Sequence, residues 1–84
     1  MCDSLGVGIF LQTFLLALTA RGLGTCVQGS IAGYPEIVRE QLSIPDEYAI
    51  LCGLAIGYPA PTFPANNLRT DRNPIEHNVV FHDF

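Results

Sequence analysis

The stretch LGVGIFLQTFLLALTA, residues 5–20, decides the fold because it predicts a helix that is apolar on every side. A helix of this kind has to be enclosed from all directions. A chain of 84 residues is too short to enclose it easily. We therefore expect this helix to lie buried at an interface between subunits. The large apolar residues that spread around it are Ile9, Phe10, Leu11, Phe14, Leu15, Leu16 and Leu18.

Both ends of this helix carry suitable residues for starting and stopping it. Asp3 or Ser4 can cap the start, and Gly22 or Gly24 can end the helix. Arg21 is expected in the last turn, where its positive charge suits the helix dipole.

The same stretch has to be tested as a membrane signal. It is about sixteen residues long, whereas a helix that spans a bilayer needs about twenty. Gln12 and Thr13 interrupt its centre, and the chain begins Met1-Cys2-Asp3 without the basic start of a secretory signal. We expect no insertion and no export. A small membrane-associated protein anchored by residues 5–20 stays open as an alternative.

The composition indicates that the chain needs a partner. Hydrophobic residues make up 49% of it and charged residues 14%, against about 25% charged in typical soluble domains. A small domain cannot hide so much apolar surface. The partner is a second subunit, a missing part of the same chain, or a membrane.

Charge and cysteine content exclude several classes of protein. The net charge of −4 is opposite to the basic surface that nucleic acids require, so we expect no nucleic-acid partner. Cys2, Cys26 and Cys52 are odd in number and widely spaced, which fits neither a disulfide framework nor a zinc motif. They are interpreted as buried thiols, and the protein as cytoplasmic.

The middle of the chain predicts a strand, a short helix and a second strand. Residues 25–28 form a short extended piece that Gly29 breaks, and Pro35 suits the first turn of a helix over residues 36–42. Glu36 and Glu40 with Arg39 are expected to form the solvated face of that helix, which Pro45 stops. The run YAILCGLAIGYP, residues 48–59, then predicts a strand covered on both faces.

After this strand the composition changes. Residues 59–74 contain four prolines and no periodicity, which predicts a stiff loop of the kind that often carries function. HNVVFHDF, residues 77–84, predicts a final extended segment that needs a sheet edge to pair with.

The loop NNLRTDRNPIE, residues 66–76, holds Arg69 and Arg72, half of the positive charge in a chain without lysine. Two arginines three residues apart in a turn can both reach one phosphate monoester, whose oxygens the planar guanidinium binds in bidentate fashion. The alternative is that they pair with Asp71, Glu76 or water at the surface, since exposed ion pairs are common and weak.

Other candidate functional residues have weaker support from the sequence. His77 and His82 lie five apart in a probable strand and hence on opposite faces, which disfavours a metal site. Ser30 has no base beside it in the sequence, so nucleophilic chemistry has no support.

The order of these pieces resembles the C-terminal part of the nitroreductase family. The resemblance is carried by ARGLGTCVQG at residues 20–29, LSIPDEY at 42–48, LCGLAIGYPA at 51–60 and NNLRTDRNPIEHNVVF at 66–81. It covers about residues 3–82. The family's N-terminal half has no counterpart here, so residues 1–84 are expected to be a partial domain, either a fragment of a longer enzyme or a truncated relative.

The resemblance implies an α+β homodimer with long helices packed across the subunit interface and flavin mononucleotide (FMN) held between the subunits. It implies two-electron transfer from NADH or NADPH to nitroaromatics, quinones or similar small-molecule acceptors. The catalytic residues stay unknown, and the isolated 84 residues are expected to be inactive. A flavin-free oligomerisation module is the alternative.

The same resemblance implies roles for individual residues. Gln28 and Gly29 match the segment that passes the flavin ring, where a glycine lets the backbone come close and Gln28 can contact the ring edge. Arg72 matches a basic residue that binds the flavin phosphate, and Arg69 is its helper. The tail from Val79 matches an arm that embraces the partner subunit.

Overall fold

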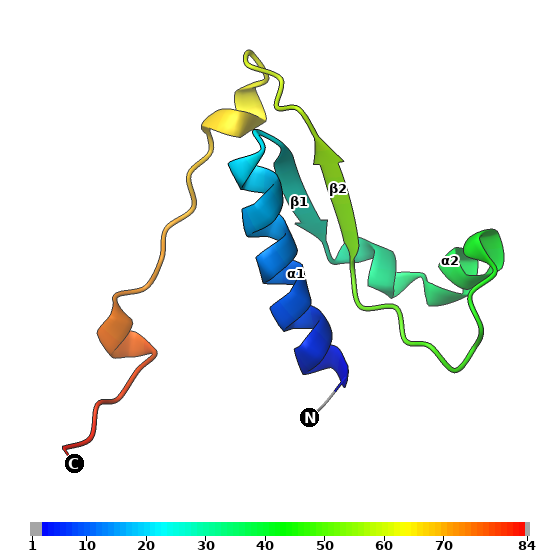
Figure 1. The fold of residues 1–84 in the computed structure, drawn as a ribbon, viewed down its shortest axis with the longest axis horizontal. Coiled ribbons are helices and arrows are strands. Elements are labelled where there is room, and N and C mark those ends of the chain that lie inside the picture. Colours follow the sequence, from blue (N-terminus) through cyan, green and yellow to red (C-terminus); the bar gives the residue numbers. More distant parts are fainter. Residues whose placement is uncertain (1–2, 84) are drawn as a thin grey trace.

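The structure, a computed structural model, describes residues 3–83, so the interpretation of Cys2 lies outside the described part. Two α-helices, two strands and three short 3-10 turns follow one another along this part, in agreement with the expected α+β class (Figure 1). In chain order they are α1 Asp3–Ala20, β1 Gly24–Gln28, η1 Ser30–Gly33, α2 Pro35–Leu42, β2 Gly53–Gly57, η2 Pro64–Asn67 and η3 Ile75–His77.

The two strands form an antiparallel pair whose register runs from Gly24 opposite Gly57 to Gln28 opposite Gly53. The first predicted strand is confirmed, whereas the second is shorter than the apolar run 48–59. Its last three residues, 55–57, are exposed, so the expected cover on both faces is absent from this chain. Within residues 3–83 the sheet has two strands, so β2 has one neighbouring strand there and the central position expected for it is not seen.

The end of α1 is fixed by Gly22, whose φ of 79° is a conformation that residues with a side chain rarely adopt. The amide of Leu23 donates to the Leu18 carbonyl at 3.0 Å, and the amide of Gly22 donates to the Thr19 carbonyl at 3.0 Å. These two bonds form a Schellman motif. Arg21 therefore lies just beyond the last turn of α1.

The start of α1 also differs from the expectation. Asp3 lies within the first helical turn, where its carboxylate suits the positive end of the helix dipole. The capping position before Asp3 lies outside the described residues.

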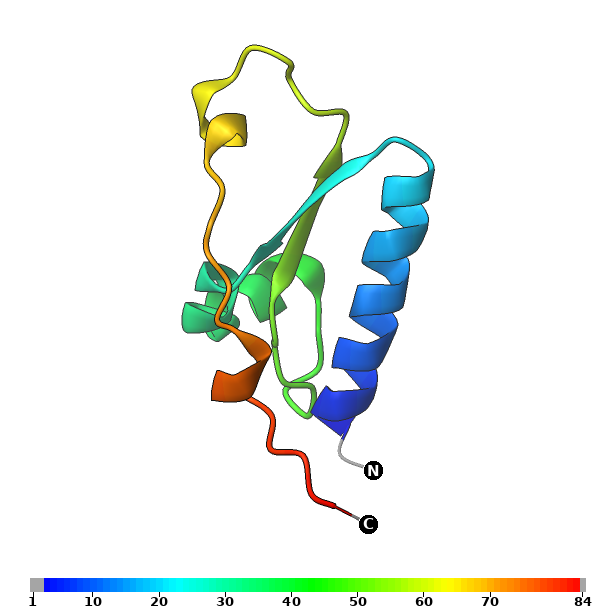
Figure 2. The same cartoon turned by 90° about the vertical axis from the view of Figure 1, so that its left-hand side faces the viewer.

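One side of α1 packs on the sheet and the other is uncovered (Figure 2). Leu11, Phe14, Leu15 and Leu18, spaced by three or four residues, are half-buried and make up the packed side. On the other side Leu5 and Ile9 are each 56% exposed and Leu16 is 62% exposed. The expected complete burial of this helix is not achieved within one chain.

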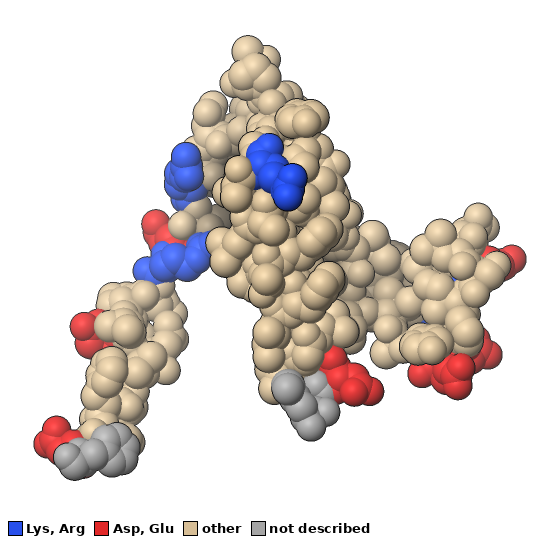
Figure 3. Space-filling model, viewed as in Figure 1, with Lys and Arg blue, Asp and Glu red and all other residues tan. Residues whose placement is uncertain are grey.

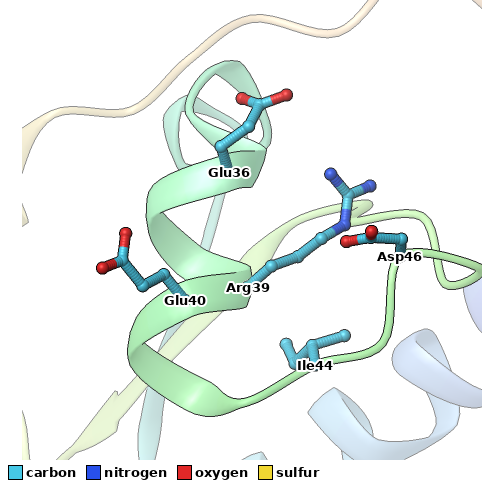
Figure 4. A pocket seen from close by; sticks show the side chains of 5 residues that line it. All are labelled: Glu36, Arg39, Glu40, Ile44 and Asp46. Carbon is cyan, nitrogen blue, oxygen red and sulfur yellow. The ribbon is translucent and has the colours of Figure 1, made fainter.

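Helix α2 begins with Pro35 at its first position, as expected, and ends at Leu42 with Ser43 in the left-handed conformation. Arg39 does not belong to a solvated face. Its Nε and Nη2 donate to the Tyr48 carbonyl at 3.3 and 3.1 Å. Figure 4 shows Arg39 extending toward the loop that carries Asp46, while Glu40 points to the other side of the helix.

Replacement of this arginine provides a stability test. Arg39→Ala should lower the free energy of unfolding by about 1–3 kcal/mol, because it removes two charged donors from one carbonyl. The measurement is the urea midpoint at a fixed protein concentration. Glu40→Ala, the adjacent exposed residue, should stay within about 0.5 kcal/mol. Equal losses in both variants would contradict a structural role for the Arg39 bonds.

The segment after β2 leaves the body of the molecule as an exposed arm, residues 58–83 (Figure 1). The side-chain amide of Asn66 donates to the Ala60 carbonyl at 2.8 Å and closes its first bend. The expected final extended segment, residues 77–84, does not begin at His77, which ends a 3-10 turn, and no strand follows it up to residue 83. The argument that disfavoured a metal site because His77 and His82 lie on opposite faces of a strand therefore no longer applies.

The chain is too open to be a self-contained body. Its radius of gyration is 16.9 Å, against about 12 Å for a compact domain of this length. Its accessible surface is 7597 Å², against about 4,900 Å² for a compact protein of this mass. No hydrophobic residue among residues 3–83 is fully buried. Within residues 3–83 the apolar side chains therefore form no closed hydrophobic core and stay accessible to other polypeptide.

Candidate functional site

Gln28 and Gly29 lie where β1 ends and the chain turns into η1. Gln28 is the last residue of β1 and pairs with Gly53. Gly29 has φ −77° and ψ −26°, so its backbone conformation does not require glycine. A Cβ built on Gly29 would meet nothing within 4 Å. What this glycine provides is a bare, exposed stretch of backbone beside the Gln28 amide.

Arg72 lies in the arm and is held by its own loop. Its Nη1 donates to the Thr70 hydroxyl at 2.7 Å and to the Asp71 carbonyl at 2.9 Å. These contacts fold the side chain back while leaving its charge without a carboxylate partner in residues 3–83. Sequence reasoning missed Thr70, although the spacing Thr-x-Arg could have signalled a hydroxyl beside the guanidinium.

Arg69 makes no hydrogen bond or ion pair within the described part of the chain. The alternative in which Arg69 and Arg72 pair with Asp71 or Glu76 is not seen in residues 3–83. The arm therefore carries two positive charges that no neighbouring acid neutralises. Such a pair can bind an anion with two or more oxygens.

The structure does not bring the four predicted residues together in one chain. Gln28 and Gly29 belong to the sheet end, whereas Arg69 and Arg72 belong to the arm, which runs separately from the sheet (Figure 1). The main contacts of the sheet are with α1 and η1, not with the turns of the arm. One copy therefore presents two separate half-sites.

Helix α1 also satisfies a simple test for membrane helices. It is long and apolar enough to cross a bilayer by length and composition. The core helix of a soluble protein and a signal sequence near the N-terminus satisfy the same test, so this observation carries little weight.

Fold and site together define an α+β chain with exposed apolar surface and a pair of arginines that no acidic side chain in residues 3–83 neutralises. The sequence profile of the nitroreductase family matches residues 2–58, two thirds of the chain. The chain belongs to the nitroreductase family.

Curated relatives agree over most of the chain. It is 39% identical over 74 residues to a 4-nitrobenzoate reductase of Nocardioides sp. (strain LMS-CY), which covers 88% of this chain and 30% of the relative. It is 38% identical over 80 residues to a 4-nitrobenzoate reductase of Pseudomonas putida, covering 95% of this chain and 35% of the relative. With the nitroreductase NfnB of Mycolicibacterium smegmatis (strain ATCC 700084 / mc(2)155) it shares 32% identity over 75 residues, or 89% of this chain and 32% of the relative. The chain thus spans about a third of the relatives it matches.

The family profile and the alignment with a single relative differ in how much of the arm they include. The family profile ends at Tyr58, before the arginine loop. The Pseudomonas putida alignment covers 95% of the chain and therefore extends through Arg69 and Arg72. The alignment with this reductase therefore continues past the end of the family profile into the arm.

Proposed function

We propose that this chain forms part of an FMN-dependent NAD(P)H oxidoreductase that reduces nitroaromatic compounds, quinones or similar acceptors by two-electron transfer. Within that enzyme, residues 1–84 constitute the C-terminal part of the nitroreductase-like domain. The enzyme is a cytoplasmic homodimer. The observation that carries the proposal is the similarity to two 4-nitrobenzoate reductases over most of the chain.

The residues of the sheet end suit one part of FMN. Bare backbone at Gly29 permits close approach of a flat ring, because no side chain stands in the way. The exposed amide of Gln28 can both donate and accept a hydrogen bond at a ring edge. Contacts of this kind adjust the electronic properties of a bound flavin.

The arm residues suit the other part of FMN. A phosphate monoester carries nearly two negative charges, and Arg69 and Arg72 carry two positive charges without an acidic partner in residues 3–83. In our proposal Arg72 binds the phosphate and Arg69 assists it. When bound, FMN supplies the electron transfer between nicotinamide and acceptor.

Gln28 and Gly29 are separated from Arg69 and Arg72 within one chain, and in our proposal a second subunit contributes to joining them. Either another subunit or the remaining polypeptide has to bring flavin-binding groups together, because one copy leaves them apart. The excess surface of the chain provides the area for such contacts.

A second candidate follows from the short span of the match. Because the chain covers about a third of its relatives, it is by itself a candidate for a flavin-free oligomerisation module. Purified protein without flavin colour, and without FMN uptake on titration, would favour this module.

A chimera tests the enzyme proposal. The matching third of the Nocardioides 4-nitrobenzoate reductase is replaced by this chain, and the oxidation of NADH and NADPH is followed with 4-nitrobenzoate as acceptor. We expect turnover that depends on added FMN, with the unaltered reductase as the positive control. A folded chimera that holds FMN but does not oxidise either nicotinamide would contradict the proposed role.

A further inference from the structure

Gly53, the first residue of β2, has no room for a side chain. A Cβ built on it would lie 3.4 Å from Cγ1 of Ile31 and closer than 3.0 Å to Cδ1 of the same residue, a separation that Cβ atoms essentially never show. Among residues 3–83 the glycine with a positive φ is Gly22, so the backbone of Gly53 does not itself require glycine. The space beside it does.

The side chain of Ile31, which belongs to η1, occupies that space. The turn η1 lies beside the start of β2 (Figure 1). Ile31 is half-buried, whereas the two residues before it, Gly29 and Ser30, are exposed. The end methyl group of Ile31 therefore docks η1 on the sheet.

Gly29 lies between two anchor points that meet at Gly53. On one side Gln28 pairs with Gly53 in the sheet, and on the other Ile31 rests on the same glycine. Between them the amide of Ala32 donates to the Gly29 carbonyl at 3.0 Å. Within residues 3–83 no side chain caps η1 by a hydrogen bond, so the turn depends on the packing of Ile31 for its place on the sheet.

The side chain of Gln28 borders the same space. Residues directly opposite each other in an antiparallel pair have their side chains on one face of the sheet. The Oε1 atom of Gln28 would lie 3.8 Å from a Cβ at residue 53, which is ordinary van der Waals contact. A larger residue at position 53 would therefore displace Ile31 and crowd the Gln28 amide at the same time.

We infer that Gly53 is a positioning residue of the flavin site, because by accommodating Ile31 it fixes the backbone at Gly29 and the amide of Gln28. The inference rests on the proposed function, in which Gly29 and Gln28 meet the flavin ring. It adds a residue that acts through Ile31. Groups that bind a rigid ring have to be held in place by their neighbours, and a displacement of about 1 Å is enough to impair them.

The charges that serve the phosphate are remote from this contact. Arg69 and Arg72 lie on the arm, and the main contacts of the sheet are with α1 and η1. Figure 3 shows positive groups on the arm, which extends away from the body of the molecule. An apolar substitution at Gly53 should therefore leave the phosphate contacts intact, so we expect FMN binding to be weakened and not abolished.

An exchange of three carbon atoms tests the inference in the chimera described above. Gly53→Val adds three carbons beside Ile31, and Ile31→Ala removes three, including both Ile31 atoms that a Cβ at residue 53 would meet. Valine suits a strand, and the double variant conserves the apolar volume, which packed regions tolerate best. Gly57→Val is the matched control, because it lies in the same strand and a Cβ there would meet nothing within 4 Å.

We expect Gly53→Val to raise the dissociation constant of FMN at least about tenfold and to change the flavin absorbance spectrum at saturating FMN. Ile31→Ala should raise the constant about three- to tenfold, because the turn loses its anchor. The double variant should return to within about threefold of the unsubstituted chimera and recover its spectrum, since the two changes compensate each other. Gly57→Val should behave as the unsubstituted chimera does. Fluorescence titration and absorbance measure these quantities.

The spectrum separates positioning from stability, because a purely structural glycine would lower the urea midpoint without altering the bound flavin. Unchanged FMN affinity and spectrum in Ile31→Ala, which does not depend on the folding of the valine variant, would overturn the inference. A double variant no better than Gly53→Val would also overturn it. An unsubstituted chimera that takes up no FMN would instead overturn the proposed function, and this inference with it.

Discussion

Leu16→Glu should turn a self-associating chain into a monomer. Leu16 is 62% exposed on the side of α1 that faces away from the sheet, and another chain has to cover that side in the proposed homodimer. The substitution removes apolar burial and places an unpaired carboxylate there, twice per dimer by symmetry. We expect the association constant to fall at least about a thousandfold, equivalent to about 4 kcal/mol. Sedimentation equilibrium measures it.

The control for this variant is Gln41→Glu. It introduces the same charge on an exposed residue of the other helix, α2, and should leave the association constant within about threefold. A Leu16→Glu chain that still sediments as a dimer would show that α1 is not the surface through which the copies meet.

Arg72→Ala should weaken FMN binding by the chimera about 10- to 100-fold. The guanidinium is free of carboxylate partners in residues 3–83 and is held in place by Thr70 and Asp71. Loss of a charged hydrogen bond to phosphate costs about 1–3 kcal/mol. Arg72→Lys should recover part of the affinity, since it keeps the charge but not the fork. Fluorescence titration with free FMN measures the dissociation constants.

Gln41→Ala, which removes an exposed polar side chain from α2, is the control for the arginine variants and should not change FMN affinity. If Arg72→Ala bound FMN as tightly as the unsubstituted chimera, the phosphate role of the arm would be wrong. Arg69→Ala, with the less direct role, should produce a smaller loss than Arg72→Ala.

Elements with local signals were predictable from the sequence. Gly22 ends α1 because a positive φ favours glycine, and Pro35 begins α2 because its fixed φ suits a first helical position. The extended piece expected at residues 25–28, before Gly29, is strand β1, which begins one residue earlier at Gly24. These features depend on neighbours in the chain, which a sequence displays directly.

Features that depend on distant residues were not predictable. Arg39 appeared solvated because nothing in its helix indicates that the Tyr48 carbonyl comes within 3.3 Å. The tail 77–84 was expected to be an extended segment on a sheet edge, but within residues 3–83 no strand pairs with it. The β2 run appeared longer for the same reason, since its length depends on the partner strand β1.

The candidate site likewise has one part that the sequence could predict and one part that it could not. Spacing alone left Arg69 and Arg72 open between surface pairing and phosphate binding, and the family resemblance favoured phosphate binding. The structure leaves both without an acidic partner in residues 3–83. The distance between the arm and Gln28 was not predictable, because it is set by the path of residues 58–68 through space. In our proposal, a second subunit or further polypeptide brings these residues together.

The central claim is that this chain contributes to a homodimer that binds FMN. The flavin content of the chimera tests this claim most directly. After purification and removal of free cofactor, we expect a dimer by sedimentation that carries FMN in a fixed molar ratio to the chain. A folded chimera that is monomeric, or that stays colourless after incubation with FMN, would contradict the claim.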